Sequence, residues 1–117
     1  MTMRSIRMSH ILLTTEELAM TIRDMLKEID ERELLFKTFE RLAKKYSACG
    51  TRSKGGDLGF LEFNTNAKEL EDAAMATALG EVGGPVKSQF GYHVFVVTEE
   101  EQMGDTGIDG LNQVSLR

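Results

Sequence analysis

The sequence predicts one α+β domain, in which strands and helices are not regularly interleaved. The first observation is length, since 117 residues is the usual size of a single domain. The second is composition, because 41% hydrophobic residues are enough to form a packed core. The third is the order of the periodic segments, which runs β, α, α, β, α, β, β. This order favours α+β over a doubly wound parallel sheet.

The first half of the chain predicts one strand and two helices. Residues 6–13 begin with alternating apolar and polar side chains, which indicates a strand. Residues 15–30 have apolar side chains at helical spacing, and Thr14 with Glu17 fits a capping box at the start of this helix. A second apolar stripe over residues 35–46 predicts the next helix.

The second half returns to strands, with one helix between them. A loop rich in Gly, Lys and Arg at 50–56 precedes a predicted strand over 57–63. Asn66 is expected to cap a helix over about 67–79. The remaining predicted segments are a turn at 80–85, a short strand at 86–88, a turn at 89–91 and a strong strand at 92–98.

A single domain is expected over residues 1–98. Residues 99–117 begin with three glutamates, contain three glycines and have few apolar side chains. A segment of this composition cannot bury enough apolar surface to offset its ordering, so we expect a flexible acidic tail.

Charge and cysteine content exclude several classes of protein. The 14 Lys+Arg and 19 Asp+Glu residues give a net charge of −5, whereas a general binder of nucleic acid or anionic membranes is more often basic. The single cysteine, Cys49, excludes an internal disulfide and a multi-cysteine zinc site. No apolar run approaches the ~20 residues that span a bilayer, and no signal-peptide pattern is present. We therefore expect a cytoplasmic monomer that binds neither nucleic acid nor membranes.

Four short motifs carry the functional interpretation. They are residues 8–12 (Met-Ser-His-Ile-Leu), 43–49 (Ala-Lys-Lys-Tyr-Ser-Ala-Cys), 55–59 (Gly-Gly-Asp-Leu-Gly) and 84–93 (Gly-Pro-Val-Lys-Ser-Gln-Phe-Gly-Tyr-His). In this order and spacing they resemble the parvulin family of peptidyl-prolyl cis/trans isomerases, over about residues 6–98. The last motif is the most specific of the four.

The resemblance implies both a fold and a site. The fold is a four-stranded antiparallel sheet surrounded by helices, parvulin/FKBP-like, in the order β-α-α-(short helix)-β-α-β-β. Two histidines lie side by side on its central strands, beneath a shallow proline-binding cleft. The implied catalytic residues are His10, Cys49, Ser88 and His93, and the implied substrate-binding residues are Leu58, Asn66, Leu70 and Phe90.

Two of the implied substrate-binding residues depart from the family pattern. Asn66 stands where the family usually has methionine, and Leu70 stands where it usually has phenylalanine. Leu70 keeps an apolar wall without an aromatic ring, and Asn66 brings an amide. These departures keep an alternative open, which is a catalytically weak or inactive parvulin-fold module that binds peptides as a chaperone.

The expected activity is isomerisation of X–Pro bonds in unfolded or flexible segments of client proteins, which assists their folding. The reaction breaks no σ bond, so neither metal nor cofactor is expected. Amide resonance sets a rotation barrier of roughly 18–20 kcal/mol, and the site must lower it by binding the twisted amide more strongly than the planar forms. Phosphate-specific parvulins carry a basic loop after the first strand. Here residues 13–17 are short and acidic, so strict phospho-dependence is not expected.

The histidine pair is expected to be a hydrogen-bonded structural dyad, with Ser88 setting the tautomer. Protonating both imidazoles would bury like charges, so activity or stability is expected to fall at mildly acidic pH. The basic run from Arg41 to Lys54 has two interpretations. It is either a solvated helix end and loop, or Arg52 or Lys54 borders the cleft and favours an acidic residue before the proline.

Overall fold

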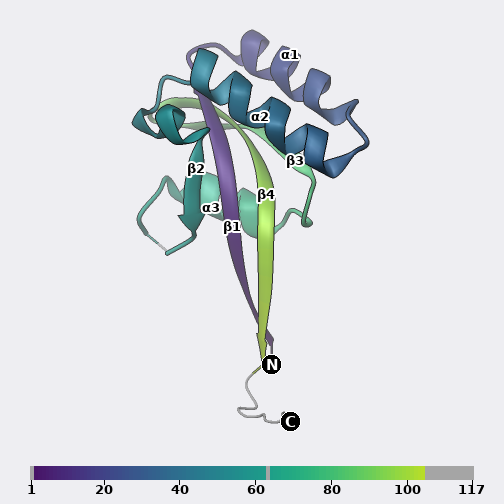
Figure 1. The fold of residues 1–117 in the computed structure, drawn as a ribbon. Helices are drawn as coiled ribbons and strands as arrows, with labels where there is room; N and C mark the ends of the chain where they lie inside the picture. The colour runs from purple at the N-terminus through teal and green to yellow at the C-terminus, as the bar shows by residue number, and fades with distance from the viewer. Residues whose placement is uncertain (1, 63, 105–117) are drawn as a thin grey trace.

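The computed structural model describes residues 2–62 and 64–104 of the chain. Its four strands form one antiparallel sheet in the order β2-β1-β4-β3, so the α+β prediction is confirmed (Figure 1). The two longest strands, β1 and β4, occupy the centre. The elements are β1 (Thr2–Leu13), α1 (Glu16–Lys27), α2 (Arg32–Tyr46), the 3-10 helix η1 (Gly50–Lys54), β2 (Asp57–Phe60), α3 (Lys68–Met75), β3 (Val82–Ser88) and β4 (Gly91–Gly104).

Helices cover both faces of the sheet, and each face buries its own apolar cluster (Figure 1). On one face Ile11 and Val94 pack with α1 and α2, including the fully buried Phe39. On the other face Met8 and Phe95 pack with α3. Successive side chains of a strand point to opposite faces, which puts His10 and His93 on the α3 face. Among the described helices, none is long and apolar enough to cross a membrane.

The two central strands are longer than the apolar pattern predicts. β1 begins at Thr2 and β4 continues to Gly104, because residues 2–7 pair with residues 99–104. Cross-strand ion pairs between arginine and glutamate stabilise this polar extension, with Arg4 Nε 2.7 Å from Glu100 Oε1. The expectation of a flexible tail was therefore wrong for residues 99–104. Residues 105–117 of that expected tail lie outside the described residues.

The helix caps also differ from the predicted ones. Thr15 caps α1, since its side chain accepts a hydrogen bond from the Leu18 N–H at 3.3 Å; Thr14 is one residue too early. Asn66 does not cap α3, which begins one residue later than expected and has no side-chain cap at Ala67. The Asn66 N–H is instead bound by a glutamate within α3, described below.

Two strand boundaries near the site differ as well. β2 ends at Phe60, after which the Leu61 N–H still donates to the Ile6 carbonyl at 2.8 Å. β3 begins at Val82 and includes part of the expected turn at 80–85. An irregular register lets this glycine-rich segment pair, and a Cβ at Gly83 would lie 2.3 Å from the Phe95 ring. The glycine thus permits a close approach that a simple turn motif does not reveal.

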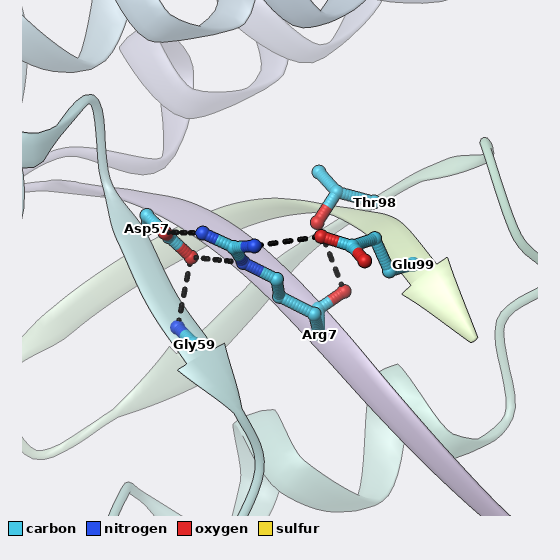
Figure 2. A network of polar contacts seen from close by, with 5 residues as sticks. All are labelled: Arg7, Asp57, Gly59, Thr98 and Glu99. Atoms are coloured by element: carbon cyan, nitrogen blue, oxygen red, sulfur yellow. Dashed lines mark hydrogen bonds and ion pairs between the residues drawn. The ribbon is translucent and has the colours of Figure 1, made fainter. Parts of the chain in front are cut away.

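A polar network at Arg7 joins β1 to β2 and β4 (Figure 2). The guanidinium binds both carboxylate oxygens of Asp57 and, through Nη1, Glu99 Oε2 at 2.6 Å. Asp57 also accepts the Gly59 N–H at 2.8 Å, and Thr98 Oγ1 donates to the Arg7 carbonyl at 3.2 Å. The bond to Arg7 holds the pKa of Asp57 below its ordinary value. This network fixes the short strand β2 beside β1.

Candidate active site

The central strands place the two histidines side by side. His10 lies opposite Phe95 and His93 lies opposite Leu12, so the histidines are diagonal neighbours across β1 and β4. Their Nδ1 atoms are 3.0 Å apart and their ring planes differ by 16°. Both side chains are buried, with 4% and 3% of their surface exposed. One imidazole therefore donates to the other, as the dyad interpretation expects.

A hydroxyl group lies at each outer end of the dyad. Ser88 Oγ is 2.7 Å from His93 Nε2, as the sequence predicts. Thr51 Oγ1 is 3.2 Å from His10 Nε2, a contact that the sequence analysis missed. The only sequence signal for Thr51 is its place two residues after Cys49, because no local periodicity connects η1 to β1.

The segment after α2 is anchored on β1 through Ser47. The buried Ser47 Oγ accepts hydrogen bonds from the N–H groups of Leu12, at 3.0 Å, and Cys49, at 3.3 Å. The Ala48 N–H donates to the Leu12 carbonyl at 2.8 Å. These three bonds hold Cys49 beside the histidine strand.

Gly56 then returns the chain to β1 at His10. Its carbonyl accepts the His10 N–H at 2.9 Å, and its own N–H donates to the Thr51 carbonyl at 3.0 Å. Gly56 has a φ of +84°, and a Cβ there would lie 2.2 Å from the His10 carbonyl oxygen. Only glycine fits this contact, which sets the position of Thr51 relative to the imidazole.

A cavity of about 400 Å³ opens beside the histidine pair. Its walls combine apolar side chains with the two imidazoles and two threonines, and the exposed Phe90 ring lies at its edge. Ser88 does not line it but supports His93 from behind. Seven of the eight predicted site residues line this cavity: His10, Cys49, Leu58, Asn66, Leu70, Phe90 and His93. The lining residues that the sequence analysis missed are Leu12, Ala48, Thr51, Thr65 and Ala67.

The loop that carries Asn66 is held by the buried carboxylate of Glu71, in α3. Glu71 Oε1 accepts the Asn64 N–H at 3.0 Å, and Oε2 accepts the N–H groups of Thr65 and Asn66 at 3.2 and 3.0 Å. Three backbone donors on one carboxylate satisfy its charge without a cation. No local sequence pattern predicts this role, because a glutamate near a helix start is ordinarily exposed, whereas Glu71 is 3% exposed.

Both histidines are neutral near pH 7. Burial, followed by the proximity of His93, lowers the pKa of His10 from its ordinary 6.5 to about 4. Burial also lowers the pKa of His93, and the charge of Glu69 partly opposes that shift. Each neutral imidazole carries one N–H donor and one nitrogen acceptor, which suits the hydrogen bonds observed here.

The basic run does not border this cavity, so that interpretation was wrong. Lys54 lines a separate cavity of about 360 Å³ on the α2 face, together with Arg7 and Asp57. Arg52 is exposed and lines neither cavity. Among the described residues, no group of three or more His, Cys, Asp or Glu side chains is arranged to hold a metal ion.

Comparisons with known proteins identify relatives of this chain. Residues 10–99 match the rotamase family described as a PPIC-type PPIase domain. Foldase protein PrsA 1 of Bacillus cereus is 44% identical over 95 residues, which are 80% of this chain and 31% of that protein. The putative peptidyl-prolyl cis-trans isomerase Cbf2 of Campylobacter jejuni is 36% identical over 110 residues, 92% of this chain and 40% of that protein. The chain thus spans well under half the length of these relatives.

Solved structures share the fold. One chain from the structural work on PEB4 and the periplasmic protein Cj1289, two SurA-like chaperones of Campylobacter jejuni, has a TM-score of 0.79 and 34% identity, covering 87% of this chain and 42% of that one. NmPin, the parvulin of Nitrosopumilus maritimus, has a TM-score of 0.68 and 35% identity, covering 83% of this chain and 98% of that one. The chain therefore belongs to the parvulin family, whose domain is the PpiC-type peptidyl-prolyl isomerase domain.

Proposed function

We propose that this chain is a peptidyl-prolyl cis/trans isomerase that acts on X–Pro bonds in unfolded or flexible segments of client proteins and so assists their folding. The observation that carries the proposal is the cavity of about 400 Å³ with a neutral histidine dyad in its wall. Leu58, Leu70 and Phe90 provide apolar surface for a pyrrolidine ring. The ring can be held there while the preceding carbonyl rotates.

The residues that line the cavity are sufficient for this chemistry. Rotation about the X–Pro bond breaks no σ bond, so stabilising the twisted amide relative to both planar forms is sufficient. Each ~1.4 kcal/mol of such stabilisation gives about tenfold in rate. The names of the relatives, a foldase and a putative peptidyl-prolyl isomerase, support the same activity.

A prolyl isomerisation assay on tetrapeptides tests the proposal. The residue before proline is varied among Glu, Ala and Lys, and we expect exchange above the uncatalysed rate for all three. Phe90→Ala is the matched variant, because Phe90 is 62% exposed and its truncation leaves the core intact. We expect Phe90→Ala to raise KM while the circular dichroism spectrum is unchanged. No acceleration by the folded wild-type chain would refute isomerase activity.

A second candidate function, a peptide-binding chaperone module with little catalysis, is favoured by Asn66. Asn66 lines the cavity, and its Nδ2 lies 3.3 Å from Thr65 Oγ1, so a polar residue stands where the family usually has an apolar one. The double variant Asn66→Met/Leu70→Phe restores the family pattern. Two results together would favour the chaperone role. The double variant would have a much larger kcat/KM than the wild type, and the wild-type chain would suppress the aggregation of an unfolded protein.

Three further expectations belong to the proposal. The acidic segment 13–17 supports action without a phosphate before proline, which paired serine and phosphoserine peptides test. The cytoplasmic location and the monomeric state stay predictions from the sequence. Size-exclusion chromatography with light scattering tests the second, with 13.1 kDa expected for a monomer.

A further inference from the structure

A continuous chain of hydrogen bonds crosses the site and ends at the hydroxyl of Thr51, a residue that lines the cavity. It begins at the Phe90 N–H, which donates to Ser88 Oγ at 3.2 Å. It continues from Ser88 to His93 at 2.7 Å, from His93 to His10 at 3.0 Å and from His10 to Thr51 Oγ1 at 3.2 Å. Thr51 lines the cavity, whereas Ser88 is buried behind the dyad.

Such a chain has two possible directions. Each neutral imidazole has one N–H, and the two Nδ1 atoms face each other, so one Nδ1 donates and the other accepts. If His93 donates, its Nε2 accepts the Ser88 proton, and His10 donates from Nε2 to Thr51. If His10 donates, every bond between Ser88 and Thr51 is reversed.

Ser88 decides between the two directions. The residue is buried, with 8% of its surface exposed, and the partners of its hydroxyl within residues 2–62 and 64–104 are the Phe90 N–H and His93 Nε2. The Phe90 N–H can only donate. In the reversed direction Ser88 would accept both bonds, and its own proton would be buried without an acceptor. The cost of an unmade buried hydrogen bond favours the first direction by about 5- to 150-fold.

From this direction we infer that Thr51 is the hydroxyl donor that faces the substrate, an inference that rests on the proposed isomerase function. His10 Nε2–H occupies a lone pair of Thr51 Oγ1, which leaves the Thr51 proton free. Among the described residues Thr51 Oγ1 has no other partner, and its side chain is half-buried at the cavity wall.

Such a donor increases the rate by stabilising the twisted amide. In the planar amide the prolyl nitrogen shares its lone pair with the carbonyl and accepts hydrogen bonds poorly. Rotation localises the lone pair on nitrogen. A hydroxyl proton directed at that nitrogen therefore binds the twisted state more strongly than either planar state, which is the condition for catalysis. No proton is transferred and no bond is broken.

The first test reads the direction without using activity. Two-bond ¹⁵N–¹H spectra of the free protein near pH 7 identify the protonated nitrogen of each imidazole. We expect His93 to be protonated at Nδ1 and His10 at Nε2. The opposite pair of tautomers would overturn the inference. Since this readout is independent of turnover, it stands or fails separately from the proposed isomerase function.

The second test measures the contribution of the hydroxyl. Thr51→Val keeps the side-chain shape and removes the donor, and Thr51→Ser keeps the donor. We expect Thr51→Val to lower kcat by about 3- to 10-fold with little change in KM, the range for one neutral hydrogen bond, and Thr51→Ser to restore most of it. A folded Thr51→Val chain with wild-type kcat would overturn the inference; Thr51→Ala gives the same readout if the valine variant does not fold.

Discussion

Acidification should destabilise this domain through the buried histidine dyad. The perturbation is a decrease of pH from 7 to 4, across the interval between the ordinary pKa of histidine, 6.5, and the pKa of His10 in the folded protein, about 4. Because the folded pKa is the lower one, the unfolded chain binds a proton first. The contribution to stability is therefore complete above pH 6.5 and is lost as pH falls towards 4.

The magnitude follows from the size of this shift. His10 alone should reduce the free energy of unfolding by about 2 kcal/mol at pH 5 and about 3 kcal/mol at pH 4. The pKa of His93 is lowered as well, so the dyad together should lose more. The burial of both rings and their 3.0 Å contact explain the direction, because an imidazolium would be desolvated beside its neighbour.

Urea unfolding between pH 7 and pH 4 measures the effect, and His10→Gln is the matched control. Glutamine offers a donor and an acceptor but does not titrate. Between pH 7 and pH 4 the free energy of unfolding of His10→Gln should therefore decrease by about 3 kcal/mol less than that of the wild type. Carboxylates contribute equally to both proteins and cancel in the comparison. Equal pH slopes in wild type and His10→Gln would refute the reasoning.

Three further predictions concern the contacts that build the site, each read by urea unfolding. Glu71→Gln removes the charge that binds three backbone N–H groups, so it should cost about 2 kcal/mol and raise KM; unchanged KM would contradict its role in holding the cavity loop. Gly56→Ala puts a Cβ 2.2 Å from a backbone oxygen at positive φ and should cost at least about 2 kcal/mol, whereas Gly50→Ala, which meets nothing within 4 Å, should cost less than about 0.5 kcal/mol. Asp57→Asn should cost about 1 kcal/mol at pH 7, because the Arg7 pair is partly exposed. The difference in stability between wild type and Asp57→Asn should decrease as pH falls below 3.8, the ordinary pKa of aspartate, because the stabilisation is lost as pH falls through the lower pKa of folded Asp57. A constant difference down to pH 2 would contradict this prediction.

The residues of the site were predicted where local sequence carries the signal. His10, Ser88 and His93 belong to short motifs on strands, and the structure joins them in one hydrogen-bond chain. Thr51 and Glu71 were missed, because each acts across a distance that no local pattern encodes. Thr51 reaches His10 from η1 across 41 residues, and Glu71 is buried although it stands in the first turn of an amphipathic helix.

The length of β4 also depends on contacts that no local pattern encodes. Residues 99–104 are acidic and contain a glycine, so their composition indicated a flexible tail. The opposite strand carries Arg4 and Arg7, whose ion pairs with Glu100 and Glu99 stabilise the extended pairing. Only the antiparallel register brings these charges together, so the extent of β4 depends on a partner nearly a hundred residues away.

The sequence by itself determined the α+β class, the family and the side chains available for chemistry, because periodicity, turn residues and short motifs are local properties. The tertiary structure alone decided how these side chains are arranged. It buried the imidazoles, which makes them neutral, and it placed the Phe90 N–H on Ser88, which sets the direction of the chain to Thr51. Burial and hydrogen-bond direction depend on neighbours from distant segments, and those neighbours exist only once the sheet has formed.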